Sequence, residues 1–199
     1  PTYSEFFGIK MMILIILIGM IGCSEEIAPR ARPHGFHKIS FPETVAYQQF
    51  ESADCPFEFT YPASGKVSRV SNDSCWVDID FPQYGLKWHL THRFVPGSGI
   101  AIGEHFEEHR KLIYKHSKKA TQIAARDYTT PAGTGKAWEV YGNVGTPAYY
   151  FLADSVQENI LMLSFYFNTA TKNDSLAPVI EYMRAEVEKS LESLRWKGE

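Results

Sequence analysis

The sequence lacks an apolar run long enough to cross a bilayer. Residues 11–22 supply twelve apolar or small residues between Lys10 and Cys23, whereas a spanning helix needs about 20. A short run of this kind is typical of an export signal. The residues Met20-Ile21-Gly22-Cys23 resemble the bacterial lipobox, in which a small residue precedes an acylated cysteine. We therefore predict a lipoprotein signal peptide over residues 1–22 and a lipid, such as palmitate, on Cys23. An ordinary secretory signal with a chance cysteine is the alternative.

The sequence also lacks the basic excess of a nucleic-acid-binding protein. Lys and Arg number 20 against 23 Asp and Glu, a formal net charge of −3, so we predict no nucleic-acid partner. Cysteine is scarce as well, with three in the chain. Once Cys23 carries lipid, Cys55 and Cys75 remain, and in an oxidising compartment such a pair predicts a disulfide. Two buried thiols that never meet are the alternative.

The remaining sequence is organised as a tether followed by strands and helices. Residues 23–40 contain prolines and a glycine but no apolar period, so we expect a lipidated tether there. Residues 41–199 are predicted to form a single domain, and no repeat of fixed period is visible. We expect strands over 57–61, 66–70, 76–81, 136–141, 147–152 and 160–167, a further strand with Trp88, Leu90, His92 and Phe94 on one face, and helices over 101–126 and 176–195.

Apolar periodicity predicts which sides of these elements are buried. In the long helix the apolar arc comprises Phe106, Leu112, Ile113, Ala120, Ile123 and Ala124. The final helix, capped by Asp174 or Ser175, has Val179, Ile180, Met183, Val187, Leu191 and Leu194 on its buried side. The strand over 160–167 is apolar on both faces and is therefore expected at the centre of a sheet. A meander of the first three strands would bring the two remaining cysteines to the same end of the sheet.

These elements predict an α+β fold, an antiparallel sheet packed by two helices. Their order resembles that of the PsbP proteins of photosystem II. This likeness rests on element order alone and carries no function.

The long helix contains a possible metal-binding motif. His105-Phe106-Glu107-Glu108-His109 matches H-x-x-E-H, the inverted zinc-peptidase motif, in which the histidines share the metal and the glutamate acts as base. No third ligand is identifiable, so His105 and His109 are weak candidates. The alternative is that both, with His116, pack at the interface between helix and sheet. Such a stripe could also make the core sensitive to pH.

Paired carboxylates provide a second candidate site. Asp78 and Asp80 share a strand face with Trp76, an arrangement that suits acid–base work or cation binding but is more often the solvated face of a sheet. The segment Gly133-Thr134-Gly135-Lys136 lacks the spacing of a phosphate-binding loop and is interpreted as a hairpin turn. No Ser lies in a G-x-S-x-G nucleophile elbow.

Two cysteine-led strands, each closing on proline, carry a resemblance to a known family. They are Cys55-Pro56-Phe57-Glu58-Phe59-Thr60-Tyr61-Pro62 and Cys75-Trp76-Val77-Asp78-Ile79-Asp80-Phe81-Pro82. With them, Pro33-His34-Gly35-Phe36-His37-Lys38-Ile39, Lys115-His116-Ser117-Lys118-Lys119-Ala120 and Cys23 are similar to the gliding motility-associated lipoprotein GldD family of Bacteroidetes.

The resemblance implies a cell-envelope protein needed for gliding, with partners among the envelope proteins of gliding and type IX secretion. It implies a membrane anchor through lipid, no catalytic residue and no cofactor, and hence no enzyme. The first hypothesis is therefore a non-catalytic scaffold. A periplasmic binding module for a small ligand or envelope polymer, and a metallopeptidase, are the alternatives. Ser24, directly after the lipidated cysteine, favours the outer membrane over the inner.

Overall fold

The structure is a computed structural model, and it describes residues 39–69, 75–96, 99–168 and 173–198. The predicted signal peptide over residues 1–22, Cys23 and most of the tether lie outside the described residues. Those described belong to one compact unit that spans Gly35–Glu199.

Within the described residues the chain forms two α-helices, two 3-10 turns and ten strands. In chain order they are β1 (Tyr47–Phe50), β2 (Phe57–Pro62), β3 (Lys66–Arg69), β4 (Trp76–Phe81), η1 (Pro82–Tyr84), β5 (Leu86–Phe94), α2 (Gly99–His116), η2 (Ser117–Lys119), β6 (Ala120–Thr130), β7 (Gly133–Gly142), β8 (Ala148–Ala153), β9 (Asn159–Phe167), α3 (Asn173–Glu192) and β10 (Arg195–Trp196).

The strands form two sheets. Seven are arranged in the order β3-β4-β5-β9-β8-β7-β6, and three in the order β1-β2-β10. All the strand pairs are antiparallel. β9 is the middle strand of the larger sheet, which confirms the prediction made from its apolar residues on both faces.

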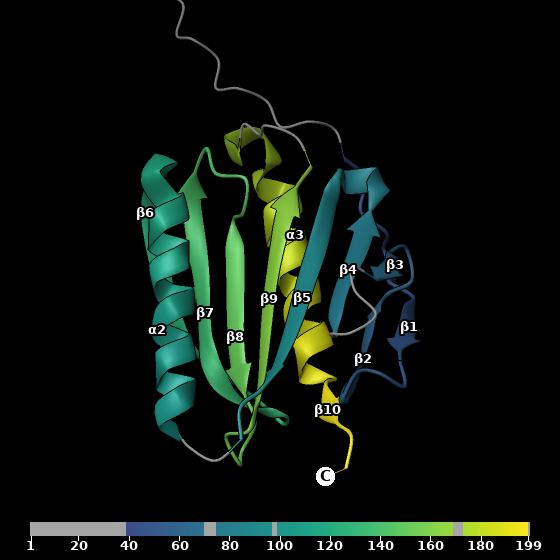
Figure 1. The fold of residues 1–199 in the computed structure, drawn as a ribbon. Coiled ribbons are helices and arrows are strands. Elements are labelled where there is room, and N and C mark those ends of the chain that lie inside the picture. Colours follow the sequence, from purple (N-terminus) through teal and green to yellow (C-terminus); the bar gives the residue numbers. More distant parts are fainter. Residues whose placement is uncertain (1–38, 70–74, 97–98, 169–172, 199) are drawn as a thin grey trace, which may run out of the picture. The chain divides into compact units, whose positions relative to one another are not determined.

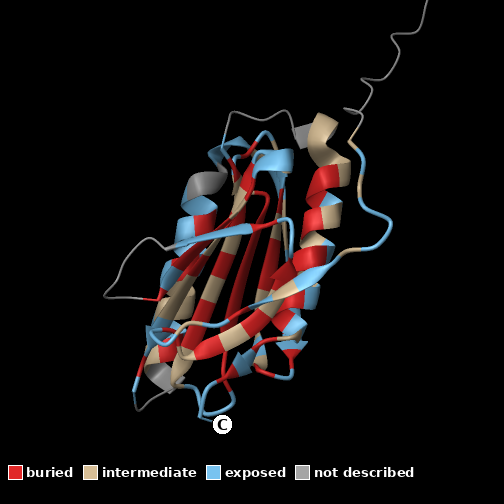
Figure 2. Cartoon of the chain, turned by 90° about the vertical axis from the view of Figure 1, so that its right-hand side faces the viewer, coloured by how far each residue is buried: buried red, intermediate tan, exposed pale blue. Residues whose placement is uncertain are grey.

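Apolar clusters lie on both faces of the larger sheet. α3 and β2 pack on one face with Trp88 and Phe165 among the residues between them. α2 packs on the other face, over β7 and β8, through Ile113, Trp138 and Phe151. Figure 1 shows α2 in front of β6 and β7 and α3 behind β9 and β5, and the edge-on view in Figure 2 shows the buried residues concentrated in the strands between the helices. The α+β architecture with antiparallel sheets and two helices is thus confirmed, and the PsbP likeness stays a prediction.

The long helix ends earlier than predicted. The prediction of helix over 101–126 is wrong after His116, because residues 120–130 form β6. This segment pairs with β7 along its length, from Thr130 opposite Gly133 to Ala120 opposite Gly142. Ala, Gln and Arg in residues 120–126 favour a helix locally, but the hairpin supplies partners that only an extended chain can use.

The predicted meander of the first three strands is also wrong. β2 pairs with β1 and β10, and not with β3. Phe57, Phe59 and Tyr61 on β2 are buried in the core shared with α3, so β2 forms a layer beside the helix and the chain enters the larger sheet only after Gly65. Cys55 and Cys75, just before β2 and β4, form a disulfide with Cα atoms 5.2 Å apart. The bridge therefore joins the two sheets.

The final helix follows the predicted pattern closely. All six residues predicted on its buried side, from Val179 to Leu194, are buried. The helix ends at Glu192, three residues earlier than predicted, so Leu194 lies beyond it. The helix begins at Asn173, so Asp174 and Ser175 lie inside its first turn instead of capping it.

The hairpin turn lies slightly earlier than predicted. Residues 131–132 make the turn, and Gly133 and Gly135 belong to β7. A Cβ on Gly135 would lie 1.7 Å from the carbonyl oxygen of Phe151 on β8. Glycine is therefore required there by the close approach of two strands.

Candidate functional site

One half of a sheet face is left without a helix among the described residues. α2 covers the β7 and β8 part of its face, and its apolar cluster extends to Ile160 and Met162 at the start of β9. The same face over β3, β4, β5 and the rest of β9 is open in Figure 1. Alternate residues of β4, β5 and β9 point to this side, since residues between them are buried in the α3 core. On β3, Lys66 and Ser68 lie opposite Asp80 and Asp78 of this face. We call this surface the open face. It comprises Lys66, Ser68, Trp76, Asp78, Asp80, Lys87, His89, Thr91, Met162, Ser164 and Tyr166.

Asp78 is the centre of an ionic cluster on the open face. Its Oδ2 lies 2.9 Å from Lys87 Nζ, and its Oδ1 lies 2.7 Å from His89 Nδ1. Lys87 also lies 3.4 Å from Asp80 Oδ1. Asp78 is 7% exposed, so the expectation of a fully solvated carboxylate pair is wrong for this residue. The bonds to Lys87 and His89 compensate its removal from water.

Lys87 responds to the same cluster. The hydrogen bond to Asp78 raises the pKa of the Lys87 ammonium, and the nearby Asp78 and Asp80 charges act in the same direction. Lys87 is thus held as a cation between two carboxylates.

His89 extends the cluster to a hydroxyl. Its Nε2 lies 3.2 Å from Thr91 Oγ1 while Nδ1 contacts Asp78, which is the order of groups in an Asp-His-hydroxyl triad. Such a triad also needs donors for a developing oxyanion. β4 and β5 are each paired with a strand on both sides, so their backbone N–H groups are used in the sheet. These two strands therefore do not supply free backbone donors for such a charge.

Trp76 gives the open face an aromatic edge. Its side chain is 40% exposed, and its ring lies 6.5 Å from the His89 ring at an interplanar angle of 69°. The structure thus brings Trp76, Asp78 and Asp80 together as the strand pattern predicted. Sequence reasoning missed Lys87, His89 and Tyr166, because they come from strands whose place beside β4 no local pattern reveals.

The two motif histidines of α2 have different surroundings. His109 is 9% exposed, and its ring lies 5.6 Å from that of Trp138, 6.0 Å from Tyr149 and 5.9 Å from Phe151. Burial lowers the pKa of His109 to about 4. His109 therefore packs at the interface of helix and sheet, as the alternative to metal binding proposed.

His105 is more exposed than His109 and lies beside Glu108, the glutamate of the motif. Its Nδ1 lies 3.5 Å from Glu108 Oε2, and the Glu108 side chain is 72% exposed. No group of three or more His, Cys, Asp or Glu among the described residues could hold a metal ion. The side chain of His116 lies outside the described part.

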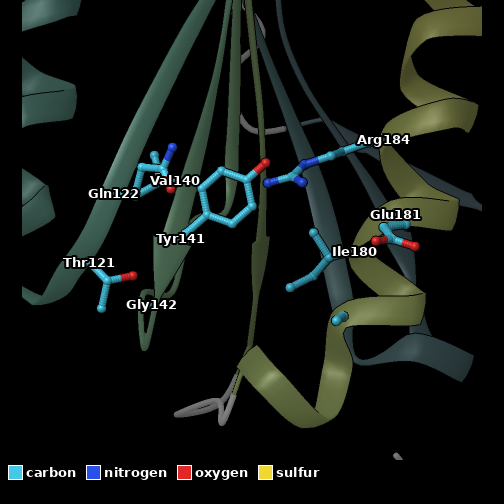
Figure 3. Close-up of a pocket in the computed structure, with 9 residues that line it drawn as sticks. Thr121, Gln122, Val140, Tyr141, Gly142, Ile180, Glu181 and Arg184 are labelled. Atoms are coloured by element: carbon cyan, nitrogen blue, oxygen red, sulfur yellow. The ribbon is translucent and has the colours of Figure 1, made fainter.

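A separate hollow of about 370 Å³ lies between α3 and the ends of β6 and β7. Figure 3 shows the Arg184 guanidinium pointing toward the Tyr141 ring, with Gln122 and Ile180 on either side. Arg184 lies 3.2 Å from Glu139 and donates to the Pro147 carbonyl at 3.0 Å. Its charge is thus already paired, and sequence reasoning had no local signal for this cluster.

No helix in the described part of the chain is both long and apolar enough to span a membrane. In comparison with known proteins, the family model for the gliding motility lipoprotein GldD matches residues 25–196. No curated protein matches the sequence. A crystal structure from Bacteroides thetaiotaomicron VPI-5482 is similar over 76% of this chain at 9% identity and a TM-score of 0.38. This chain spans 48% of the length of that one.

Proposed function

Because the chain belongs to the gliding motility lipoprotein GldD family, we propose that it is a non-catalytic scaffold that stabilises or assembles the gliding and type IX secretion machinery. Family membership makes it a lipid-anchored envelope protein of gliding motility. The finer layout is part of the proposal: a signal peptide over residues 1–22, an anchor on Cys23, a tether to residue 40 and one domain beyond it, on the outer membrane.

The observation that supports a scaffold is the state of the open face. Asp78, Lys87 and His89, the groups suited to chemistry, are joined to one another by short contacts on a paired sheet. A disulfide between the two sheets adds rigidity to the same unit. Fixed polar surfaces of this kind bind without large rearrangement. The exposed Trp76 favours the second candidate, a binding module for an envelope polymer.

The scaffold proposal is tested in a deletion strain complemented with variants. Glu108→Gln removes the base that a zinc peptidase would need, and its exposed position makes the protein itself tolerant of the change. We expect Glu108→Gln to restore colony spreading and the abundance of the other gliding envelope proteins, as measured by quantitative mass spectrometry. An abundant Glu108→Gln protein in non-motile cells would instead support the metallopeptidase.

The anchor is tested in the same strain with Cys23→Ala. We expect a folded protein that no longer labels with radioactive palmitate, no longer partitions into detergent and fails to restore spreading. Ser24→Ala, one residue beyond, is the matched control and should keep the lipid. Equal labelling of Cys23→Ala and the parent protein would rule out this anchor.

A further inference from the structure

We propose that the open face binds a neutral polysaccharide strand of the cell envelope, with Trp76 as its stacking platform. This goes beyond the scaffold role and rests only on the envelope location that accompanies it. A scaffold with such a site would be held at one end by lipid and at its domain by glycan.

Trp76 is the first element of the site. The chain has four tryptophans, all within the described residues, and their exposed fractions are 40% for Trp76, 0% for Trp88, 1% for Trp138 and 6% for Trp196. Sugar rings present an apolar face of C–H groups, which packs on an aromatic plane. Thr91 lies opposite Trp76 on β5, and Met162, which packs against the α2 cluster, follows on β9. A strip without charged side chains therefore crosses three strands.

Two polar rows run beside this strip. Asp78, His89 and Ser164 are in register in the first, and Asp80, Lys87 and Tyr166 in the second. These side chains offer carboxylate acceptors, an ammonium donor and hydroxyls, the groups that pair with sugar hydroxyls. Contacts among Asp78, Lys87 and His89 hold them in place before any ligand arrives, which reduces the entropy lost on binding.

Charge balance indicates a neutral ligand. The carboxylates of Asp78 and Asp80 are matched by Lys87 and by Lys66, which lies opposite Asp80 on β3. A polyanion such as nucleic acid or a phosphorylated lipid would need an excess of cations. A protein partner fits less well, because the cores of protein interfaces are depleted of charged residues, whereas charged side chains occupy the two rows beside Trp76.

The test uses the full-length lipidated protein in detergent and an N-acetylglucosamine hexamer as the probe. Iodide quenches exposed indoles, and since the other tryptophans are buried, quenching reports on Trp76. We expect saturating hexamer to protect Trp76 from iodide. Heparin, a polyanionic sugar chain, should protect it far less. Unchanged quenching with millimolar hexamer, or stronger protection by heparin, would overturn the proposal.

Variants locate the site by calorimetric titration. Trp76→Ala should weaken binding about tenfold or more, and Trp76→Tyr, which keeps an aromatic plane, should weaken it less. Phe94→Ala is the matched control. Phe94 is 59% exposed on β5, but its position in the strand places it on the other face of the sheet from Lys87, His89 and Thr91. Equal losses in Trp76→Ala and Phe94→Ala would refute the site.

Failure of this proposal and failure of the scaffold are distinguishable. Binding is measured on purified protein, while the scaffold is judged from spreading and from the abundance of envelope proteins in cells. A photoreactive residue at the exposed position 68 of the open face leaves Trp76 in place. If it crosslinks to a protein in intact cells, with no glycan captured, the open face is assigned to a protein partner and the glycan proposal is overturned.

Discussion

His109 is the residue whose surroundings most clearly predict a response to acid. Its pKa is lowered to about 4 by burial, while an unfolded histidine titrates near 6.5. The unfolded chain therefore binds the proton first, and this contribution to stability is complete above pH 6.5 and is lost as pH falls toward 4. The sensitivity of the core to pH therefore rests on the His109 imidazole, which is buried among Trp138, Tyr149 and Phe151.

We predict that His109→Leu removes part of the acid sensitivity. Between pH 7.5 and 4.5 the wild type should lose roughly 2–3 kcal/mol of unfolding free energy that the variant keeps, at 1.36 kcal/mol per pKa unit. Urea unfolding at both pH values measures the difference. His105→Gln, on the same helix but more exposed, is the control and should lose as much as the wild type. Parallel losses in wild type and His109→Leu would contradict the account.

Gly135 supports a second prediction at this scale. Because a Cβ there would lie 1.7 Å from the Phe151 carbonyl oxygen, Gly135→Ala must separate β7 from β8. We expect a cost of roughly 3 kcal/mol, at the upper end of the range for overpacked sites. Gly103→Ala is the control, since nothing lies within 4 Å of a Cβ on this helical glycine, and it should stabilise by up to about 1 kcal/mol. Chemical denaturation compares the two.

At the element scale, two adjacent apolar residues of α2 differ sharply in burial. Leu112 and Ile113 both belong to the predicted apolar arc, yet Leu112 is 48% exposed and Ile113 is 1% exposed. The buried residues are spaced as Ile102, His109 and Ile113, the side of the helix that meets β7 and β8. The buried side of α2 is thus narrower than the predicted apolar arc. The prediction counted Ala120, Ile123 and Ala124 as part of the helix, although they belong to β6.

We predict that Ile113→Ala costs about 2–5 kcal/mol, the range for a fully buried aliphatic side chain. Leu112→Ala is the matched control and should cost less than about 1 kcal/mol, since its side chain is half in water. Urea midpoints and cellular protein levels give the readout. Similar losses in the two variants would show that α2 does not pack as described.

The same elements show what a sequence can and cannot predict. β4 over residues 76–81 was predicted to the residue, because its alternation and its closing proline are local signals. β6 was missed, since its extended form depends on pairing with β7. The candidate site was predictable to the same extent. The shared face of Trp76, Asp78 and Asp80 follows from the alternation within one strand, but the contacts of Lys87 and His89 depend on the pairing of β5 with β4.

At the scale of the whole molecule, the disulfide connects parts that are otherwise joined by a short segment. Cys55 precedes β2 of the smaller sheet and Cys75 precedes β4 of the larger one, 20 residues apart in sequence. Trp76, the tryptophan of the open face, directly follows the second cysteine of the bridge, Cys75. The bridge therefore positions the start of β4 as well as the layer that covers α3.

We predict that the Cys55→Ser/Cys75→Ser double variant remains folded but is less stable by about 3 kcal/mol, the chain-entropy estimate for a loop of this length. The loss arises because the unfolded chain regains the freedom that the crosslink removes. Urea unfolding with and without reductant measures it. Reductant should lower the wild-type midpoint to that of the double variant and leave the variant unchanged. Exported protein can also be unfolded without reductant and its free thiols titrated; two free thiols would contradict the bridge. A wild-type midpoint that does not respond to reductant would show that the disulfide adds no stability.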